Sequence, residues 1–199
     1  MLTGTGAVLN RARPRIGQSA MVIGIGGIGL SVLQGLALSN CGTIIAIDAN
    51  PAKEAAARQF GATHFIAAGP DVDTVAAVKE IVPAGVDHAF ECVGHPALIR
   101  TAIDLLDWGG QCILLGVPKF GTEASFVVQS LYNDKSILGC RYGAARPHHD
   151  IPLFVDLYKA GKLKLDELVS QTFQPEQVQE ALDAMHGGAL NRAVLDFSS

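Results

Sequence analysis

Charged residues are scarce in this chain of 199 residues: Asp, Glu, Lys and Arg make up 17% of it, against 49% hydrophobic residues, and the formal net charge is −4. Neither an excess of basic residues nor a basic face is present, so we expect no nucleic-acid partner. The first twenty residues do not place a charged segment ahead of an apolar one, so we expect no signal peptide. The high apolar content fits a parallel sheet buried on both faces, in a chain long enough for one large domain or one and a half.

Cysteines are few and scattered, with no CxxC pair among them: Cys41, Cys92, Cys112 and Cys140. This spacing argues against a structural zinc site and against a disulfide framework. Unpaired cysteines are typical of proteins in a reducing compartment, so we expect a cytoplasmic location.

Charge is missing altogether from residues 16–47, a length sufficient for a transmembrane helix. Five glycines between positions 24 and 35 oppose that interpretation, although glycine does occur where membrane helices touch. Polar side chains also interrupt the run, at Gln18, Ser19, Ser31, Gln34 and Asn40. We therefore expect no membrane partner.

The same run carries the pattern of a βαβ unit, with β-type, helix-type and β-type stretches at 20–23, 30–39 and 43–47. The first stretch breaks into Gly24-x-Gly26-x-x-Gly29, and the last ends on Asp48. A unit that binds a dinucleotide needs these parts at this spacing. Gly24 permits a tight turn, Gly26 lets the backbone approach a pyrophosphate, and Gly29 lets the helix pack on the strand. The helix N-terminus favours the phosphates, and Asp48 is placed to accept hydrogen bonds from a ribose diol.

Two other interpretations of the glycines fit the sequence less well. A methyltransferase also uses a glycine-rich first turn and an acid after the second strand, but the order Gly26-Gly27-x-Gly29 favours a dinucleotide. A structural turn with no ligand explains neither the third glycine nor Asp48.

Strand and helix patterns alternate along the rest of the chain, which predicts right-handed crossovers and a doubly wound α/β sheet. Further strands are expected at 64–67, 86–93, 111–115 and 136–140, with an edge strand at 125–128. Helices are expected at 3–12, 52–60, 73–82 and 97–106. Beyond Tyr142 the pattern changes to a helix at 147–160, a strand at 168–173, a helix from 175 and a strand at 193–197.

Short segments along the whole chain form one specific set: Thr3-Gly4-x-Gly6-Ala7, Gly24 to Gly29, Ile47-Asp48-x-Asn50-Pro51-x-Lys53, Phe60-Gly61-Ala62-Thr63, Phe90-Glu91-Cys92-Val93-Gly94, Leu115-Gly116-Val117-Pro118, and Ile151-Pro152 with Asp156-Leu157-Tyr158. On these residues the chain resembles the C-terminal half of the zinc-dependent medium-chain alcohol dehydrogenases. The resemblance implies a six-stranded parallel Rossmann sheet in residues 1–142 that binds NAD. It implies that residues 143–199 form a C-terminal leg, which packs on that domain and on a catalytic domain outside this chain. It also implies a homodimer or a higher homo-oligomer.

The resemblance further implies a role for each matching residue. Asp48 and Lys53 would hold the adenosine ribose, Val93, Gly94 and His95 would flank the adenine, and Gly24 would form the turn. The pyrophosphate would face Gly26, Gly27 and Ile28, with Arg192 reaching back to it. The nicotinamide would meet the backbones of Leu115, Val117 and Tyr142, and Thr3 would pack against its ring. Taken alone, Arg192 and Lys53 are ordinary exposed cations.

The chain departs from this family at its start. There the zinc ligands, the proton relay and the four-cysteine lobe belong to an N-terminal domain, and the last zinc ligand lies just upstream of the Thr3-Gly4 segment. The chain is thus interpreted as a fragment, a truncated product or a stand-alone coenzyme module of an NAD-dependent alcohol dehydrogenase. The alternatives are a non-catalytic NAD(H)-binding or dimerisation module, and a zinc-free quinone or enoyl reductase. The last prefers NADPH, against which Asp48 argues.

The other polar residues are weaker candidates for a catalytic or metal-binding role. Glu91 and Cys92 end a strand at the crevice, where packing beside the adenine is favoured over a reactive thiol. His148 and His149 are adjacent in sequence, so they do not share a helix face. Asp87 and His88 are successive strand residues that point to opposite faces. We therefore assign no catalytic residue and no metal ligand.

We predict that the 199-residue chain by itself neither oxidises ethanol with NAD nor holds stoichiometric zinc. The reason is that no group of Cys, His, Asp or Glu in it has zinc-ligand spacing. Elemental analysis and an assay of ethanol-dependent NADH formation measure the two properties. One tightly held zinc per chain, together with that activity, contradicts the prediction.

Overall fold

The computed structural model describes residues 1–188 and 190–198. The chain divides into two compact units, Met1–Pro152 and Leu153–Ser199. This division falls within the helix α6 (Pro147–Lys159), later than the boundary at residue 142 expected from the sequence. The packing of the second unit on a further domain stays a prediction.

The first unit is built on a six-stranded sheet in the order β3-β2-β1-β4-β5-β6, in which all neighbours run parallel. The strands are β1 (Ser19–Ile23), β2 (Thr43–Asp48), β3 (His64–Ala67), β4 (Val86–Glu91), β5 (Leu106–Leu114) and β6 (Ser136–Gly139). The predicted doubly wound, six-stranded parallel sheet is therefore confirmed. Because β4 returns to pair with the opposite side of β1 from β2, the strand order reverses between β1 and β4.

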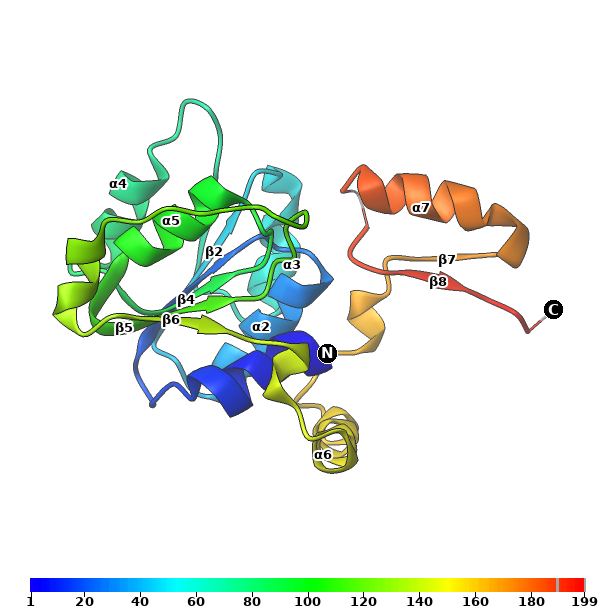
Figure 1. Cartoon of the computed structure of the whole chain (residues 1–199). Coiled ribbons are helices and arrows are strands. Elements are labelled where there is room, and N and C mark those ends of the chain that lie inside the picture. The colour runs from blue at the N-terminus through cyan, green and yellow to red at the C-terminus, as the bar shows by residue number, and fades with distance from the viewer. Residues whose placement is uncertain (189, 199) are drawn as a thin grey trace. The chain divides into compact units, whose positions relative to one another are not determined.

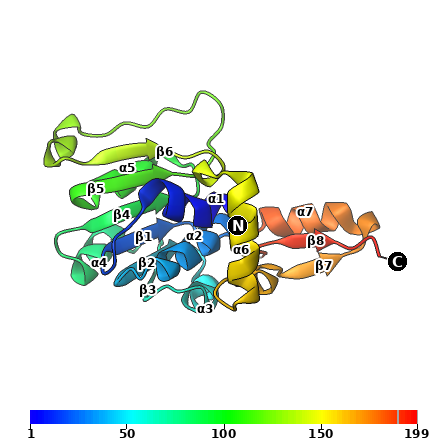
Figure 2. The same ribbon diagram turned by 90° about the horizontal axis from the view of Figure 1, so that it is seen from below.

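Helices cover both faces of this sheet (Figures 1 and 2). One face carries α4 (Thr74–Ile81) and α5 (Pro96–Asp104), and the other carries α1 (Leu2–Gly6), α2 (Gly27–Leu38) and α3 (Glu54–Gln59). Local signals set several helix starts. The side chain of Asp73 accepts a hydrogen bond from Ala76 N–H ahead of α4, and Asn50 does the same for Ala52 N–H ahead of the 3-10 turn η2 (Pro51–Lys53).

The strands are buried on both faces, which explains their continuous apolar sequences. Met21 and Ile23 pack into a core with Val78 of α4 and Ile103 of α5. On the other face, Val22 is fully buried as well. The charge-free residues 16–47 thus fold as a strand, a helix and a strand. Within the described residues, every helix falls short of the length and apolarity that a membrane span requires.

The second unit contains a small parallel pair, β7 (Gln171–Phe173) and β8 (Ala193–Leu195). Between them lie the 3-10 turn η6 (Pro175–Gln177) and helix α7 (Val178–His186). The strand expected at 168–173 is shorter than predicted, because its partner β8 offers only three residues for pairing. Residues Asp166–Leu168 form a 3-10 turn, η5, instead.

Two further expectations of the sequence differ in detail. The helix predicted at 3–12 is two elements, α1 and a π-helix, η1 (Ala7–Ala12). Strand β5 begins at Leu106, well before the predicted start at 111. Its register against β4 shifts between Val86 and His88, and Gly109 has a positive φ of 68°. Gly109 and Gly110 therefore form an irregularity within the strand.

The edge strand predicted at 125–128 is wrong. These residues carry no strand, and a 3-10 helix, η3 (Val128–Asn133), follows them. A strand requires a neighbour for its hydrogen bonds, and in the described chain β6 is the last strand on its side of the sheet, with no pairing to residues 125–128. Self-association stays a prediction of the family resemblance, which sedimentation of the purified chain would test.

A partly buried carboxylate links the amino ends of the two central strands, β1 and β4. Asp87 of β4 accepts hydrogen bonds from the Ser19 N–H and Oγ, both at 2.7 Å, and from Gln18 Nε2 at 3.1 Å. Burial disfavours the charged form of this carboxyl group, but the bonds from Ser19 and Gln18 outweigh it and lower its pKa below the ordinary value. Gln18 in turn contacts His88 Nε2 at 3.0 Å. Burial lowers the pKa of His88.

We predict that Asp87→Asn lowers the free energy of unfolding by about 1–2 kcal/mol at pH 7. The substitution replaces one acceptor oxygen with an NH₂ group, which then faces a hydrogen-bond donor of Ser19 or Gln18. A carboxyl group whose folded pKa is depressed stabilises the fold above its unfolded pKa of about 3.9, and this contribution disappears as pH falls through the folded pKa. The difference from the unmutated chain should therefore shrink below about pH 4. Urea titrations at pH 7 and in acid measure it, with Asp71→Asn, at an exposed aspartate, as the control. Equal stabilities at pH 7 would show that the network contributes nothing.

Candidate functional site

The carboxyl ends of the parallel strands meet in a crevice where the strand order reverses. Four loops border it. They follow β1, β2, β4 and β5 and consist of residues 24–29, 48–53, 92–95 and 115–118. The site residues predicted in the first unit lie on these loops, except Thr3 on α1 and Tyr142 after β6.

The glycine loop after β1 has the three properties expected from its spacing. Gly24 has a φ of +91°, and its N–H donates to Ile47 O at 2.9 Å. A Cβ on Gly29 would lie 2.0 Å from Gly24 O, so the first turn of α2 packs directly against the backbone of the turn at Gly24. A Cβ on Gly26 would meet nothing within 4 Å. The space above Gly26 is therefore open, beside the start of α2, whose first N–H groups have no partners within the helix.

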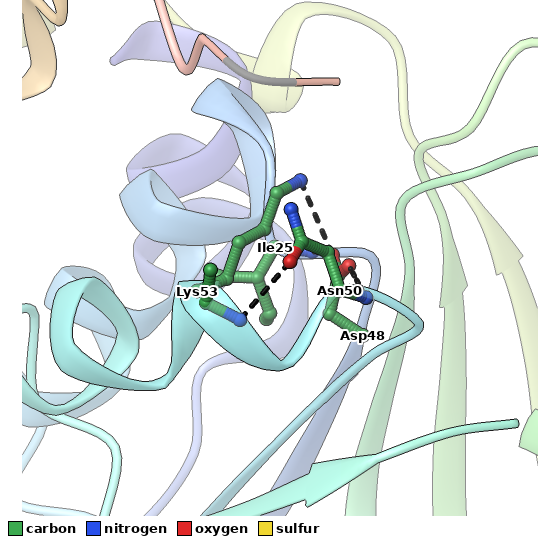
Figure 3. Close-up of polar contacts among 5 residues, drawn as sticks. Ile25, Asp48, Asn50 and Lys53 are labelled. Carbon is green, nitrogen blue, oxygen red and sulfur yellow. Dashed lines mark hydrogen bonds and ion pairs between the residues drawn. The ribbon is translucent and has the colours of Figure 1, made fainter. Parts of the chain in front are cut away.

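Asp48 stands at the tip of β2, and each of its carboxylate oxygens accepts a hydrogen bond from a neighbouring backbone N–H (Figure 3). Its Oδ2 accepts from Ile25 N–H at 2.7 Å, and its Oδ1 accepts from Asn50 N–H at 2.9 Å. Lys53 Nζ lies 3.4 Å from Oδ2. Each oxygen of an ionised carboxylate accepts more than one bond, so Asp48 retains acceptor capacity toward the crevice while its orientation is fixed by the backbone.

Three adjoining cavities follow the crevice. An apolar one of about 340 Å³ is lined by Ile23, Gly24, Ile47, Asp48, Ala49, Ala68, Thr74, Val93, Leu98 and Thr101. A second, of about 320 Å³, is lined by Gly24 to Gly29, Asp48, Lys53, Cys92 and Val93. A third, also about 320 Å³, is lined by Thr3, Ile28, Leu114 to Val117 and Cys140 to Tyr142. Shared lining residues, Asp48 between the first two and Ile28 between the last two, join them into one groove.

A carboxylate that sequence reasoning treated as packing turns out to organise the groove. The side chain of Glu91 is fully buried and accepts hydrogen bonds from Val93 N–H at 2.9 Å and Gly94 N–H at 2.8 Å. Its carbonyl oxygen accepts from Leu115 N–H and Gly116 N–H. Glu91 therefore fixes the loops after β4 and β5 together. The signal available in the sequence was a charged residue at the end of a strand that is otherwise buried.

The same two loops touch through glycines. A Cβ on Gly116 would lie 2.0 Å from Gly94 N, and a Cβ on Gly94 would lie 2.8 Å from Pro118 N. Gly94 also has a φ of +85°. No other residue type fits this contact, which separates the first cavity, at Val93, from the third, at Val117.

The thiols near the groove are poor nucleophiles. Burial, followed by the charge of Glu91, raises the pKa of Cys92 above its ordinary range and that of Cys112 to about 12. Both therefore stay protonated at neutral pH, whereas a reactive cysteine needs its thiolate.

The structure brings eleven of the predicted residues to the cavity walls: Thr3, Gly24, Gly26, Gly27, Ile28, Asp48, Lys53, Val93, Leu115, Val117 and Tyr142. Gly94 adjoins them through Gly116. His95 instead accepts a hydrogen bond from Ala97 N–H at the start of α5, at 3.3 Å. Arg192 is exposed in the second unit, and its proposed reach to the pyrophosphate stays a prediction. The Ile25 N–H, which orients Asp48, is a further group of the site that was not among the predicted residues.

Residues 27–160, which make up most of the chain, match the protein family described as zinc-binding dehydrogenase. The chain belongs to this family. The match places it in the C-terminal, coenzyme-binding half of the zinc-dependent alcohol dehydrogenases, as the resemblance implies.

The sequences of curated relatives align with nearly the whole chain. It is 36% identical to S-(hydroxymethyl)glutathione dehydrogenase from Paracoccus denitrificans, over 97% of the chain and 53% of the relative. It is also 36% identical to alcohol dehydrogenase class-3 from Cereibacter sphaeroides, over 98% of the chain and 54% of the relative. The chain thus spans about half the length of the curated relatives it matches.

Solved structures show the same correspondence. An alcohol dehydrogenase zinc-binding domain protein from Burkholderia ambifaria matches all of the chain with a TM-score of 0.94 and 36% identity, over 53% of its own length. Benzyl alcohol dehydrogenase from Acinetobacter calcoaceticus matches 96% of the chain with a TM-score of 0.92 and 34% identity, again over 53% of its own length. Within the described residues of this zinc-binding dehydrogenase chain, no three His, Cys, Asp or Glu side chains gather as metal ligands.

We predict unequal losses of stability from two alanine substitutions in the glycine loop. Gly29→Ala forces a Cβ onto Gly24 O and should cost roughly 3 kcal/mol or more, the upper end of overpacking. Gly26→Ala enters open space at a φ of −94° that alanine adopts freely, and should cost less than about 1 kcal/mol. Thermal or urea unfolding compares the two variants. Equal losses would mean that the loop does not fit the strand and helix as described.

Proposed function

We propose that this chain is the NAD(H)-binding half of an oxidoreductase that transfers hydride between an alcohol or aldehyde and NAD. The observation that carries the proposal is Asp48, oriented by the Ile25 N–H at the junction of an apolar cavity and an open glycine loop. The printed names of the relatives, which are alcohol and S-(hydroxymethyl)glutathione dehydrogenases, support the substrate class. The cytoplasmic location and the homo-oligomer belong to the same proposal.

The residues of the groove fit a dinucleotide. The apolar cavity suits an adenine ring, and Asp48 with Lys53 at its border suits the adenosine ribose. The open space above Gly26 is the place that a pyrophosphate would fill, where the first N–H groups of α2 have no partners within the helix. The cavity bordered by Thr3, Val117 and Tyr142 suits the nicotinamide.

When bound, the nicotinamide supplies the hydride chemistry. The residues of this chain contribute binding and orientation. Asp48 accepts hydrogen bonds from the ribose, Gly26 and Gly27 admit the phosphates, and the backbone after β5 receives the carboxamide. The alcohol and the zinc that polarises it are proposed to belong to the part of the relatives that this chain does not span.

We predict that the chain binds NAD(H) at least about 100-fold more tightly than NADP(H), since each 1.4 kcal/mol is tenfold. A 2′-phosphate removes one hydroxyl donor to Asp48, a bond worth about 1.5–3 kcal/mol, and sets two negative groups against each other. Lys53, 3.4 Å from Asp48, offsets part of the repulsion but does not replace the lost bond. Fluorescence titrations with NADH and NADPH measure the ratio. Equal affinities in the unmutated chain would show that Asp48 does not hold the ribose.

Three variants separate the physical causes of the predicted preference for NAD(H). Asp48→Gly removes charge and acceptor, so it should weaken NADH and shrink the ratio. Asp48→Asn removes the charge and replaces one of the two acceptor oxygens with an NH₂ group, but it keeps an oxygen for the Ile25 N–H, so NADH should weaken less than in Asp48→Gly. Gly26→Ala, whose Cβ enters the open space, should weaken NADH and NADPH by the same factor.

A further inference from the structure

The wall of the third cavity is formed in part by an unusual turn. Tyr142, Gly143 and Ala144, the 3-10 turn η4, all have positive φ, at 50°, 71° and 47°. Two of these three residues carry a Cβ, which makes the left-handed conformation costly, and such strain persists only where the surroundings enforce it. The side chain of Tyr142 lies largely exposed on the cavity wall. Something outside the turn must therefore hold it.

One part of that support is the helix that carries Thr3. A Cβ on Gly143 would lie 2.1 Å from Leu2 O, and a Cβ on Gly6 would lie 2.9 Å from Gly143 O. The turn and α1 thus meet backbone to backbone. This contact places Thr3 and Tyr142 on neighbouring walls of the same cavity, but it provides no hydrogen bond to the carbonyl of Gly143.

The hydrogen bond comes from Asn10, on the π-helix η1. Its Nδ2 donates to Gly143 O at 3.3 Å and to Asp150 Oδ2 at 2.9 Å. An amide NH₂ has two donors, so this geometry uses both. The π-helix is a rare element, found frequently at functional sites, and here it carries a side chain that bridges the turn and α6.

Asp150, in the first turn of α6, is the fixed end of this bridge. It is only 2% exposed. Its Oδ2 also accepts from Arg146 N–H at 2.8 Å, and its Oδ1 lies 2.9 Å from His149 Nδ1. A carboxylate with three N–H partners does not move freely, so Asn10 transmits a fixed position to Gly143.

We propose that Asn10 and Asp150 are positioning residues for the nicotinamide end of the groove, where they hold the turn Tyr142–Ala144 in its binding conformation. The proposal rests on the proposed function, because the third cavity is taken as the nicotinamide site. Neither residue lines any of the three cavities. They act on the coenzyme only through the turn.

Two ligands distinguish this role from a general contribution to folding. NADH would occupy all three cavities, whereas ADP-ribose, which lacks nicotinamide, would occupy the first two. Asn10→Ala should weaken NADH about tenfold, the equivalent of one hydrogen bond, and change ADP-ribose by less than about twofold. Asn133→Ala, the same chemical change at a residue that lines a separate cavity, is the matched control and should change neither. Unchanged NADH affinity, or equal weakening of both ligands, overturns the proposal.

A second measurement does not depend on coenzyme. The amides of Ala144 and Ala145 donate to Arg141 O and Tyr142 O within the turn. In Asn10→Ala their hydrogen exchange should accelerate at least about tenfold, while the Ile25 amide, bound to Asp48, keeps its rate. Unchanged exchange in the turn overturns the positioning role. Failure of the unmutated chain to bind either ligand would instead overturn the proposed function.

Asp150→Asn is the second variant, in case Asn10→Ala does not fold. Asparagine has nearly the same shape as aspartate but only one acceptor oxygen. In the unmutated chain the two oxygens of Asp150 accept from three N–H partners. We expect an intermediate result, with faster exchange at Ala144 and Ala145 and a smaller loss of NADH affinity. Wild-type exchange and wild-type NADH affinity in this variant count against the role of Asp150.

Discussion

The close approach of α2 to the turn after β1 is the constraint on which the site depends. Because Gly29 has no Cβ, the first turn of the helix rests against Gly24 O, where a Cβ would lie 2.0 Å away. That contact aims the helix N-terminus over the crevice and leaves the space above Gly26 open. It also presents the Ile25 N–H to Asp48. A larger residue at position 29 would displace these features together.

Similar close contacts between backbones, made possible by glycine, occur elsewhere along the groove. Gly94 and Gly116 touch between the loops after β4 and β5, and Gly6 and Gly143 touch beneath the third cavity. At each place two backbones meet without side chains between them, so the cavity walls are set by main-chain positions. Main-chain positions are less adaptable than side chains, which suits the proposed binding of a coenzyme by backbone groups.

Carboxylates complete the frame, and each of them accepts main-chain N–H groups. Asp48 holds the glycine loop, Glu91 the loop after β4, Asp87 the start of β1, and Asp150 the start of α6. Of these four carboxylates, Asp48 alone lines the three cavities, while Glu91 acts through the backbone of the loops that border them. A chain with so few charged residues therefore uses four of its 19 acidic residues to orient backbone.

The amino-acid sequence by itself determined the βαβ unit, the parallel sheet and the place of Asp48. Those features depend on periodicity and on spacings of a few tens of residues, and glycine spacing limits which backbone conformations are sterically allowed. Tertiary structure alone decided the rest. The expected strand at 125–128 found no neighbour to pair with, Glu91 became an anchor only once β4 and β5 lay side by side, and Asn10 met Asp150 across 140 residues of chain. Such contacts depend on where distant segments meet in the fold, and no local pattern records that.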